Sequence, residues 1–237
     1  MNKEQFIQNY RNAFGDYELP IVFWYSEEPV ALAEKTRGCF IGNLKTARKG
    51  QFYSLSADTI SCPGGKIYTG FSAAPPFIGG FVSGKERYKE SEALVTDFIS
   101  NLNMPDRKKA YINFVSIDKV ENFDRIEGLI FFATPDVLSG LISWALYDTN
   151  KADAVSVPFG SGCSSMISET LVENQKQGHR CFLGMFDPSA RPQVDSNVLT
   201  LGIPLSRFEK MLVTMEESCI QGTHAWKKVK QRIENEL

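Results

Sequence analysis

The sequence predicts an α+β (mixed α/β) fold, in which a single domain holds a mixed β-sheet with flanking helices. Runs rich in β-branched and aromatic residues alternate with stretches whose apolar residues recur at helical spacing. Strand–helix pairs occur at 128–147, 153–176 and 197–218, but isolated strands occur earlier in the chain. Neither a repeat nor a low-complexity linker interrupts the chain, so we expect residues 1–237 to form one domain.

The N-terminal half predicts short elements separated by turns. We expect helices where apolar residues follow a helical period and a glycine ends the pattern. We expect strands where compact β-rich runs are bounded by turn residues. The expected elements are helices over 2–14, 39–48 and 85–102 and strands over 19–25, 51–55 and 110–117.

Residues 71–84 have an unusual composition, because aromatic residues are interspersed with Gly and Pro. The segment is too apolar for a solvated linker and too broken for a regular element, so we expect a loop packed over the body of the domain. Phe71, Phe77 and Phe81 would then either cover a ligand, as a lid, or complete the core.

The C-terminal half predicts longer elements. Two of its helices begin where a proline follows a β-rich run, at Pro135 and Pro204. The expected elements are strands over 128–133, 180–186 and 197–203, helices over 134–147, 204–218 and 223–236, and a strand–loop–helix unit over 153–176.

The composition gives no reason to expect nucleic acid or a membrane as a partner. The 26 Lys and Arg nearly balance the 28 Asp and Glu, whereas nucleic acids and anionic membranes attract basic patches. No segment approaches the ~18 uninterrupted apolar residues of a spanning helix, and no apolar signal core follows the N-terminus. Five cysteines are an odd number for a secreted disulfide framework. We therefore expect a cytoplasmic protein, whose oligomeric state the sequence leaves open.

The most distinctive stretch is Gly160-Ser161-Gly162-Cys163, which follows a β-branched run that stops at Pro158. Small residues let a ligand approach the backbone, and the next helix points its free N–H groups into the same space. A thiol at that position should have its thiolate form favoured. Cys163 is therefore a candidate nucleophile, and His179 is the candidate base. The alternative is a tight turn beside a small buried hydrophobic residue.

A second junction of similar design occurs at Ser61-Cys62-Pro63-Gly64-Gly65. Proline suits the first position of a helix, so Cys62 would be the N-cap residue. The two glycines also permit an extended loop. The glycines expected to bind a ligand at the two junctions are Gly64, Gly65, Gly160 and Gly162.

Four cysteines are candidate metal ligands, namely Cys39, Cys62, Cys163 and Cys181. Three of them stand at expected element junctions, where ligands are usually presented, whereas Cys219 is expected to be structural. None has the short C-x-x-C spacing of a zinc site, so the fold would have to assemble the four. Thiolates suit zinc or an iron–sulfur cluster. The alternative is that these cysteines are ordinary core residues.

Arg191 is a candidate partner for an anionic ligand. Prolines on both sides of the loop 187–192 stiffen it and would hold the guanidinium in one orientation. The alternative is an ion pair with Asp187 or Asp195.

An ordered set of short motifs resembles one known family. The motifs are Arg37-Gly38-Cys39, Ala47–Gly50, Asp58, Ser61–Gly65, Gly70, Gly162-Cys163, Arg180–Gly184 and Ile203-Pro204. Over about residues 20–215 they are similar to the family catalogued as domain of unknown function 169, which occurs in archaea and bacteria. That family has no established activity, so the resemblance implies no substrate. It implies cysteines at the positions of Cys39, Cys62, Cys163 and Cys181, and hence a cysteine-centred site.

Three hypotheses remain open. The first is a cysteine-lined pocket that binds a metal, an iron–sulfur centre or a small anionic ligand, with a link to redox chemistry. The second is a thiol enzyme in which His179 assists Cys163, and the third is a binding or assembly module that uses residues 71–84. The chain lacks P-loop, dinucleotide-binding, zinc-protease and nucleophile-elbow motifs, which disfavours nucleotide-dependent enzymes of a common type.

Overall fold

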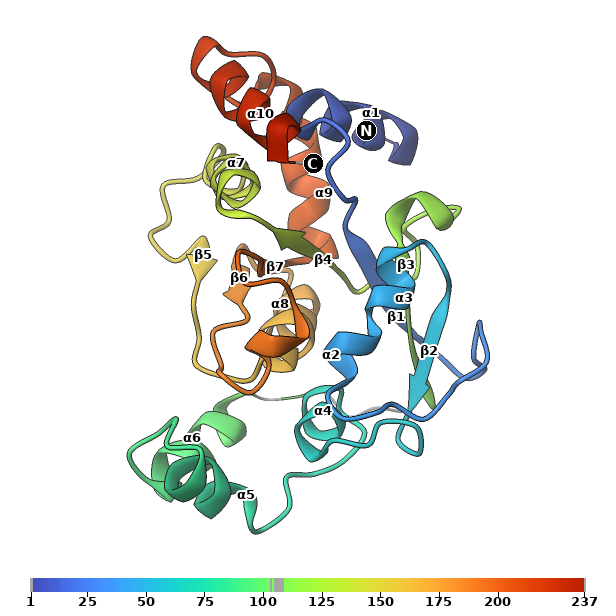
Figure 1. Ribbon diagram of the computed structural model, residues 1–237, viewed down its shortest axis with the longest axis vertical. Coiled ribbons are helices and arrows are strands. Elements are labelled where there is room, and N and C mark those ends of the chain that lie inside the picture. Colours follow the sequence, from blue (N-terminus) through green and yellow to red (C-terminus); the bar gives the residue numbers. More distant parts are fainter. Residues whose placement is uncertain (1, 103, 105–108, 237) are drawn as a thin grey trace.

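A seven-stranded mixed sheet forms the centre of the computed structural model, which describes residues 2–102, 104 and 109–236 (Figure 1). The strand order is β2-β3-β1-β4-β7-β6-β5, and neighbouring strands are antiparallel except for the parallel pair β5–β6. The strands are β1 (Ile21–Ser26), β2 (Tyr53–Ser56), β3 (Tyr111–Ser116), β4 (Gly128–Ala133), β5 (Val155–Ser156), β6 (Cys181–Gly184) and β7 (Leu199–Pro204). This sheet and its flanking helices confirm the predicted α+β fold class.

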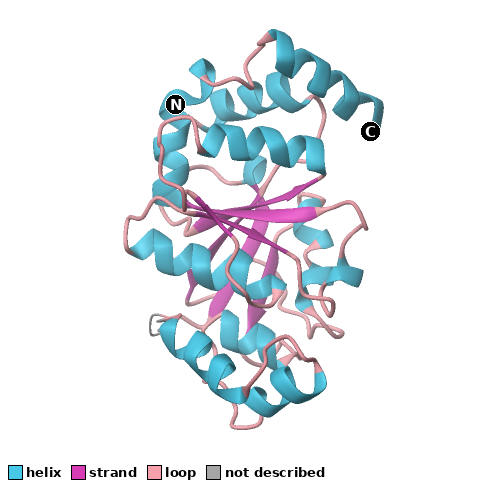
Figure 2. Cartoon of the chain, turned by 90° about the vertical axis from the view of Figure 1, so that its left-hand side faces the viewer, coloured by secondary structure: helices cyan, strands magenta, loops and turns pink. Residues whose placement is uncertain are grey.

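Helices cover both faces of the sheet (Figure 2). None of those in the described residues combines the length and apolar character that spanning a membrane requires. The helices are α1 (Lys3–Phe14), α2 (Phe40–Asn43), α3 (Lys45–Arg48), α4 (Pro63–Tyr68), α5 (Ile78–Gly80), α6 (Glu92–Asn101), α7 (Pro135–Ala145), α8 (Glu169–Gln175), α9 (Leu205–Thr214) and α10 (His224–Glu236). A π-helical segment, Phe81–Lys85, extends α5, and a second one, Ser164–Ser168, precedes α8. Short 3₁₀ turns span Ile117–Lys119, Arg191–Gln193 and Met215–Glu217.

The central strands are apolar on both sides, which creates two cores. Successive side chains of a strand point to opposite faces. In β4, Phe131 therefore belongs to one core, and its neighbours Ile130 and Phe132 belong to the other. A continuous apolar run of this kind is typical of a strand buried on both faces.

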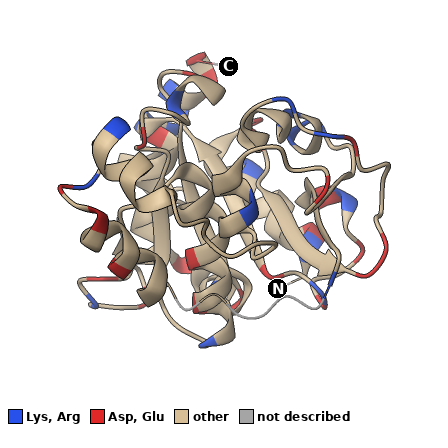
Figure 3. Cartoon of the chain, turned by 90° about the horizontal axis from the view of Figure 1, so that it is seen from below, with Lys and Arg blue, Asp and Glu red and all other residues tan. Residues whose placement is uncertain are grey.

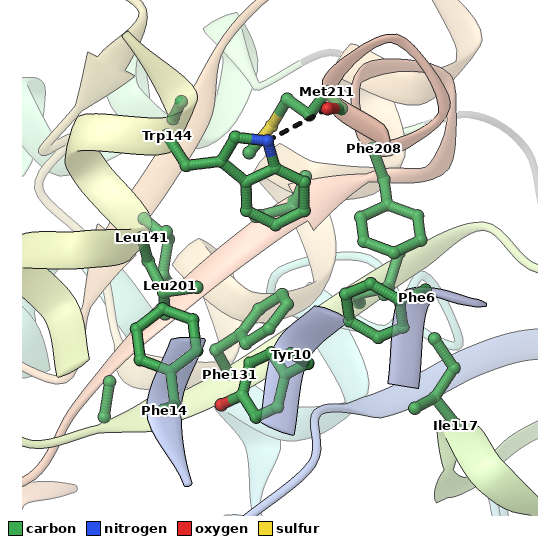
Figure 4. Close-up of a cluster of buried hydrophobic side chains, with 14 of the residues drawn as sticks. Phe6, Tyr10, Phe14, Ile117, Phe131, Leu141, Trp144, Leu201, Phe208 and Met211 are labelled. Atoms are coloured by element: carbon green, nitrogen blue, oxygen red, sulfur yellow. Dashed lines mark hydrogen bonds between the residues drawn. The ribbon is translucent and has the colours of Figure 1, made fainter. Parts of the chain in front are cut away.

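We call one side of the sheet the helical face, because α1, α7, α9 and α10 cover it. Its core is dense and aromatic (Figure 4). The ring of Phe6 meets that of Phe208 edge to face at 4.9 Å between centroids, and Trp144 Nε1 donates a hydrogen bond of 2.9 Å to the Met211 carbonyl oxygen. Both described ends of the chain lie on this side, far from α4 and α5 (Figure 1).

We call the other side the cavity face. It is covered by α2, α3, α8 and the π-helix Ser164–Ser168, all of them short. Ile41 and Leu44 from α2 and its C-cap pack there beside Met166. Short elements joined by loops leave room at the end of the sheet near α4 and α5, where the candidate site lies.

The structure confirms most of the predicted elements and corrects two. The predicted helix over 85–102 begins only at Glu92, because Ser91 caps it by accepting a hydrogen bond from the Leu94 amide and Arg87 has a positive φ of 56°. Residues 71–84 contain α5 and part of a π-helix, not a simple loop, and the side chains of Phe77 and Phe81 are 59% and 40% exposed.

Candidate functional site

A cavity of about 420 Å³ opens on the cavity face, at the end of the sheet near α4 and α5. We call it the cysteine cavity. Five segments surround it: the start of α2, α4 with its N-cap, residues 77–88, the loop that precedes the π-helix Ser164–Ser168, and the loop that follows β6. Its surface is mainly apolar. The apolar and aromatic side chains that line it include Ile41, Ile67, Tyr68, Phe77, Ile78, Phe81, Val82 and Phe159.

Three of the four candidate cysteines line the cysteine cavity. Cys39 is the N-cap residue of α2, Cys62 is the N-cap residue of α4, and Cys163 directly precedes the π-helix Ser164–Ser168. The two loop-to-helix junctions that the sequence singled out therefore face one cavity. Pro63 occupies the first turn of α4, as predicted.

The fourth candidate, Cys181, lies elsewhere. It begins β6, belongs to the core of the helical face and interacts with the Arg207 side chain. The four sulfurs therefore do not meet, and within the described ranges no group of three or more His, Cys, Asp or Glu side chains is arranged to hold a metal ion. Strand geometry explains the separation, because the direction of each β6 side chain fixes the face it reaches.

The Cys62 sulfur lies near the Cys39 side chain and the backbone amides of Phe40 and Gly65, which are hydrogen-bond donors for its ionised form. These donors lower the pKa of Cys62 to about 6, although burial acts in the opposite direction. The same interaction raises the pKa of Cys39, because its proton is held between the two sulfurs, and burial adds to this rise. The two shifts favour the thiolate form at Cys62 and the thiol form at Cys39.

Two glycines are required by close packing around these sulfurs. A Cβ atom at Gly65 would lie 2.7 Å from Cys62 Sγ, and one at Gly162 would lie 2.5 Å from Met185 Sδ. By contrast, a Cβ atom at Gly64 would meet only the Tyr68 ring, at 3.9 Å. Gly160 does not line the cysteine cavity and packs against Ser164 and Phe98. The structure therefore places three of the four predicted glycines at the cavity wall.

Cys163 does not have the favoured thiolate that its position before a helix suggested. Its side chain is buried, which raises its pKa to about 12, although the Ser161 hydroxyl at 2.9 Å partly opposes this rise. Nor does the structure bring His179 to it. The His179 ring lies 2.8 Å from Asp153 Oδ1 and 3.3 Å from Lys151 Nζ, and it does not line the cavity.

Arg191 also lies outside the cysteine cavity. Its guanidinium donates hydrogen bonds to the carbonyl oxygens of Val198 and Ser196, the latter at 2.7 Å. The side chain thus holds the turn before β7, and it binds backbone oxygens instead of the carboxylates of Asp187 or Asp195.

Asp187 is a residue of the site that the sequence interpretation missed. It is only 5% exposed, lines the cysteine cavity and accepts a hydrogen bond of 3.0 Å from Ser189 Oγ through Oδ2. Its other oxygen, Oδ1, has no hydrogen-bond partner of normal geometry in the described structure. Burial raises the pKa of this carboxyl group. The available signal was an aspartate directly after a strand and between apolar residues.

The charges around the cavity do not suit an anion. Of the acidic and basic residues in the described part of the chain, only Glu86 and Asp187 line it. At this end of the molecule, basic and acidic positions are interspersed (Figure 3). Within the described residues, no basic side chain therefore lines the cavity to pair with an anion.

The comparisons with known proteins give one match. The sequence pattern of the family described as uncharacterised ArCR, domain of unknown function 169, matches residues 18–213. No curated protein and no solved structure was found to match the chain. The matched residues include all three cysteines of the cysteine cavity as well as Asp187. This chain therefore belongs to the uncharacterised ArCR family.

Proposed function

We propose that this protein binds a small, mainly apolar molecule in the cysteine cavity and presents Cys62 to it as a reactive thiolate. The observation that carries the proposal is the environment of Cys62. Cys62 is the N-cap residue of α4 and lies in the wall of an apolar cavity, where the nearby Cys39 side chain and two backbone amides lower its pKa. A volume of about 420 Å³ is within the usual range of small-molecule sites.

The thiolate supplies the chemistry of this site without a histidine base. A thiolate is the nucleophilic form of cysteine, and Cys62 is ionised by its donors before any ligand arrives. Cys39 keeps a proton next to it and is therefore the nearest proton donor. Cys163 is the third thiol, and its raised pKa makes it a neutral part of the wall.

Alkylation kinetics test this proposal. We expect iodoacetamide at neutral pH to modify Cys62 first, ahead of the exposed Cys219 and well ahead of the buried Cys163 and Cys181. Between pH 7 and 6 the Cys62 rate should fall only about twofold, whereas an ordinary thiol loses about tenfold. Peptide mass spectrometry measures the alkylation rate of each cysteine.

Two variants provide the controls for this experiment. Cys62→Ser should remove the fast phase, and Cys219→Ser should leave it intact. Slow and equal labelling of all five cysteines would contradict the proposal and would favour a binding or assembly module that uses residues 71–84.

A bound metal is the competing occupant of these thiols. Zinc or an iron–sulfur cluster would use Cys39, Cys62 and Cys163, although the described residues form no group arranged for a metal. Anaerobic purification followed by elemental analysis and an absorption spectrum separates the two cases. A metal-free protein with fast Cys62 labelling supports the free thiolate, and a stoichiometric metal lost in Cys62→Ser contradicts it.

A further inference from the structure

We propose that the cysteine cavity binds an organic ammonium ion with an apolar body, and that Asp187 supplies its counter-charge. The inference rests on the proposed function, because it concerns the ligand of the same cavity. It adds the charge of that ligand and the residue that recognises it. Three observations carry it: a buried acidic side chain, the sign of the charges in the wall, and the aromatic rings around them.

Asp187 is a buried acidic side chain whose charge is not paired. It is only 5% exposed, and it lines the cavity. Ser189 Oγ donates a hydrogen bond to its Oδ2, whereas its Oδ1 has no hydrogen-bond partner among the described residues. None of the ion pairs that these residues form includes Asp187. A charge removed from water is costly unless an opposite charge compensates it, so a ligand cation would stabilise this carboxylate.

The second charged side chain in the wall has the same sign. Glu86 lines the cavity as well, and no Lys, Arg or His of the described ranges does so. Two carboxylates in an apolar cavity attract a cation and repel an anion, because an apolar environment screens charges less than water does. The cavity therefore discriminates between ligands by the sign of their charge.

Aromatic rings provide the second element of cation recognition. The rings that line the cavity are those of Tyr68, Phe77, Phe81, Tyr88 and Phe159. The face of an aromatic ring attracts a cation, and several rings together form a site for an ammonium group. Phe159 already makes this kind of contact within the chain, since Lys89 Nζ lies 4.4 Å from its ring centroid, although Lys89 itself does not line the cavity.

Ser189 holds the acid and one of the rings together. Its hydroxyl donates to Asp187, and its backbone amide donates a hydrogen bond of 3.1 Å to the Tyr88 hydroxyl oxygen. The Tyr88 ring in turn meets the Phe159 ring at 6.2 Å between centroids. Asp187, Tyr88 and Phe159 also line a neighbouring cavity of about 320 Å³, so they stand together at the boundary of the two cavities. We place the ammonium group at this corner and its apolar body beside α5.

The test compares three probes that share an apolar body and differ in charge. Phenylbutylamine is an ammonium ion at neutral pH, phenylbutanol is neutral and phenylbutyrate is an anion. Isothermal titration calorimetry with the full-length reduced protein measures their affinities. We expect the ammonium ion to bind at least about tenfold more tightly than the alcohol, and the anion to bind more weakly than the alcohol.

Variants of the acidic residues identify the counter-charge. Asp187→Asn keeps the shape of the side chain and should bring the affinity for the ammonium ion to within about threefold of that for the alcohol, without weakening the alcohol. Glu86→Gln should have a smaller effect, because Glu86 is only half-buried and its charge is screened by solvent. Glu90→Gln is the matched control: this residue is exposed and outside the cavity, so the affinities should not change. Circular dichroism establishes that each variant is folded.

A variant of an exposed ring tests the aromatic part of the site without touching the buried acid. Phe81 is 40% exposed, so the fold should tolerate its replacement. Phe81→Leu keeps an apolar side chain and removes the ring face, so it should weaken the binding of the ammonium ion more than that of the alcohol.

Equal affinities for the ammonium ion and the alcohol would overturn the inference. An Asp187→Asn variant that kept the full preference for the ammonium ion would overturn it as well. In both cases fast labelling of Cys62 by iodoacetamide would leave the proposed function standing. If none of the three probes bound, the inference would fail together with the ligand-binding part of the proposed function. Tight binding of the ammonium ion with slow labelling of Cys62 would support the inference and contradict the proposed thiolate.

Discussion

The two faces of the sheet are built differently. The helical face is covered by α1, α7, α9 and α10, which have 10 to 13 residues each and enclose a continuous aromatic core. The helices that border the cysteine cavity, α2, α4 and α5, have four, six and three residues. Long helices bury a complete apolar stripe, whereas short ones leave many capping residues and loops exposed to a cavity. The reactive groups thus gather beside the short elements, at one end of the cavity face.

The cysteines show what this difference does to one residue type. On the helical face, Cys181 is fully buried and its pKa is raised to about 12 by burial. On the cavity face, Cys62 is half-buried and its pKa is lowered to about 6 by the Cys39 thiol and two amides. The comparison shows that hydrogen-bond donors at a helix start, and not the presence of a cysteine, create the thiolate.

The largest predicted effect is on the helical face. Trp144→Ala should lower the free energy of unfolding by about 3–5 kcal/mol, because it empties the space beside the Phe6 and Phe208 rings. It also leaves the Met211 carbonyl oxygen without the indole donor. Trp144→Phe keeps most of the apolar body and should cost clearly less. Urea unfolding measures both, and a loss below about 1 kcal/mol for Trp144→Ala would contradict the division between the faces.

The next effect concerns the wall of the cavity, where neighbouring glycines form a matched pair. Gly65→Ala places a Cβ atom 2.7 Å from Cys62 Sγ and 2.8 Å from Ile60, so it should destabilise the fold by about 1–3 kcal/mol. It should also slow Cys62 alkylation at pH 6, because the sulfur moves from its amide donor. Gly64→Ala adds a methyl group in ordinary van der Waals contact with the Tyr68 ring, so it should neither destabilise the fold nor slow the alkylation. Equal effects of the two variants would show that Gly65 does not position the sulfur.

The sequence predicted the helical face better than the cavity face, and the physical reason is periodicity. α1, α7 and β4 each repeat their apolar residues over two or more turns or several pleats, so that the pattern is visible locally. The segment before α6 has no such repeat. Its helix starts at the Ser91 cap, and irregular residues 86–91, which follow the π-helix Phe81–Lys85, take the place of the expected first turns of α6. Apolar content alone does not distinguish one continuous helix from a π-helix that is followed by irregular residues and a shorter helix.

For the candidate site, the sequence located both loop-to-helix junctions but did not indicate which sulfur has the lowered pKa. Proline and glycine around Cys62, and glycines before Cys163, mark the junctions locally. Which sulfur is ionised depends on Cys39, which a distant segment brings into contact with Cys62. The same limit hid Asp187, whose burial follows from the packing of three separate loops. Contacts between distant segments have no local signature in one sequence.

A third prediction uses pH to sharpen the contrast between the faces. The folded pKa of Cys62 is below its ordinary value, so its thiolate stabilises the folded state at high pH, and this contribution is lost as pH falls through about 6. The difference in unfolding free energy between the unmodified protein and Cys62→Ser should therefore increase from about pH 6 to pH 9. Urea titrations across this window measure the difference. If the unfolding free energies of the two proteins changed with pH in parallel, the lowered pKa of Cys62 would be contradicted.

The smallest effect on stability is expected at Phe81, on the outer wall of the cavity. Its side chain is 40% exposed, so Phe81→Ala should change the free energy of unfolding by no more than about 0.5 kcal/mol. The same variant removes an aromatic surface from the cavity and should weaken the binding of the neutral fluorescent probe N-phenyl-1-naphthylamine there. Val213→Ala, on an exposed part of α9, serves as the control and should change neither the free energy of unfolding nor the binding of the probe. If Phe81→Ala lowered stability as much as Trp144→Ala does, the outer wall of the cavity would contribute as much to stability as the core of the helical face, and the contrast between these two regions would fail.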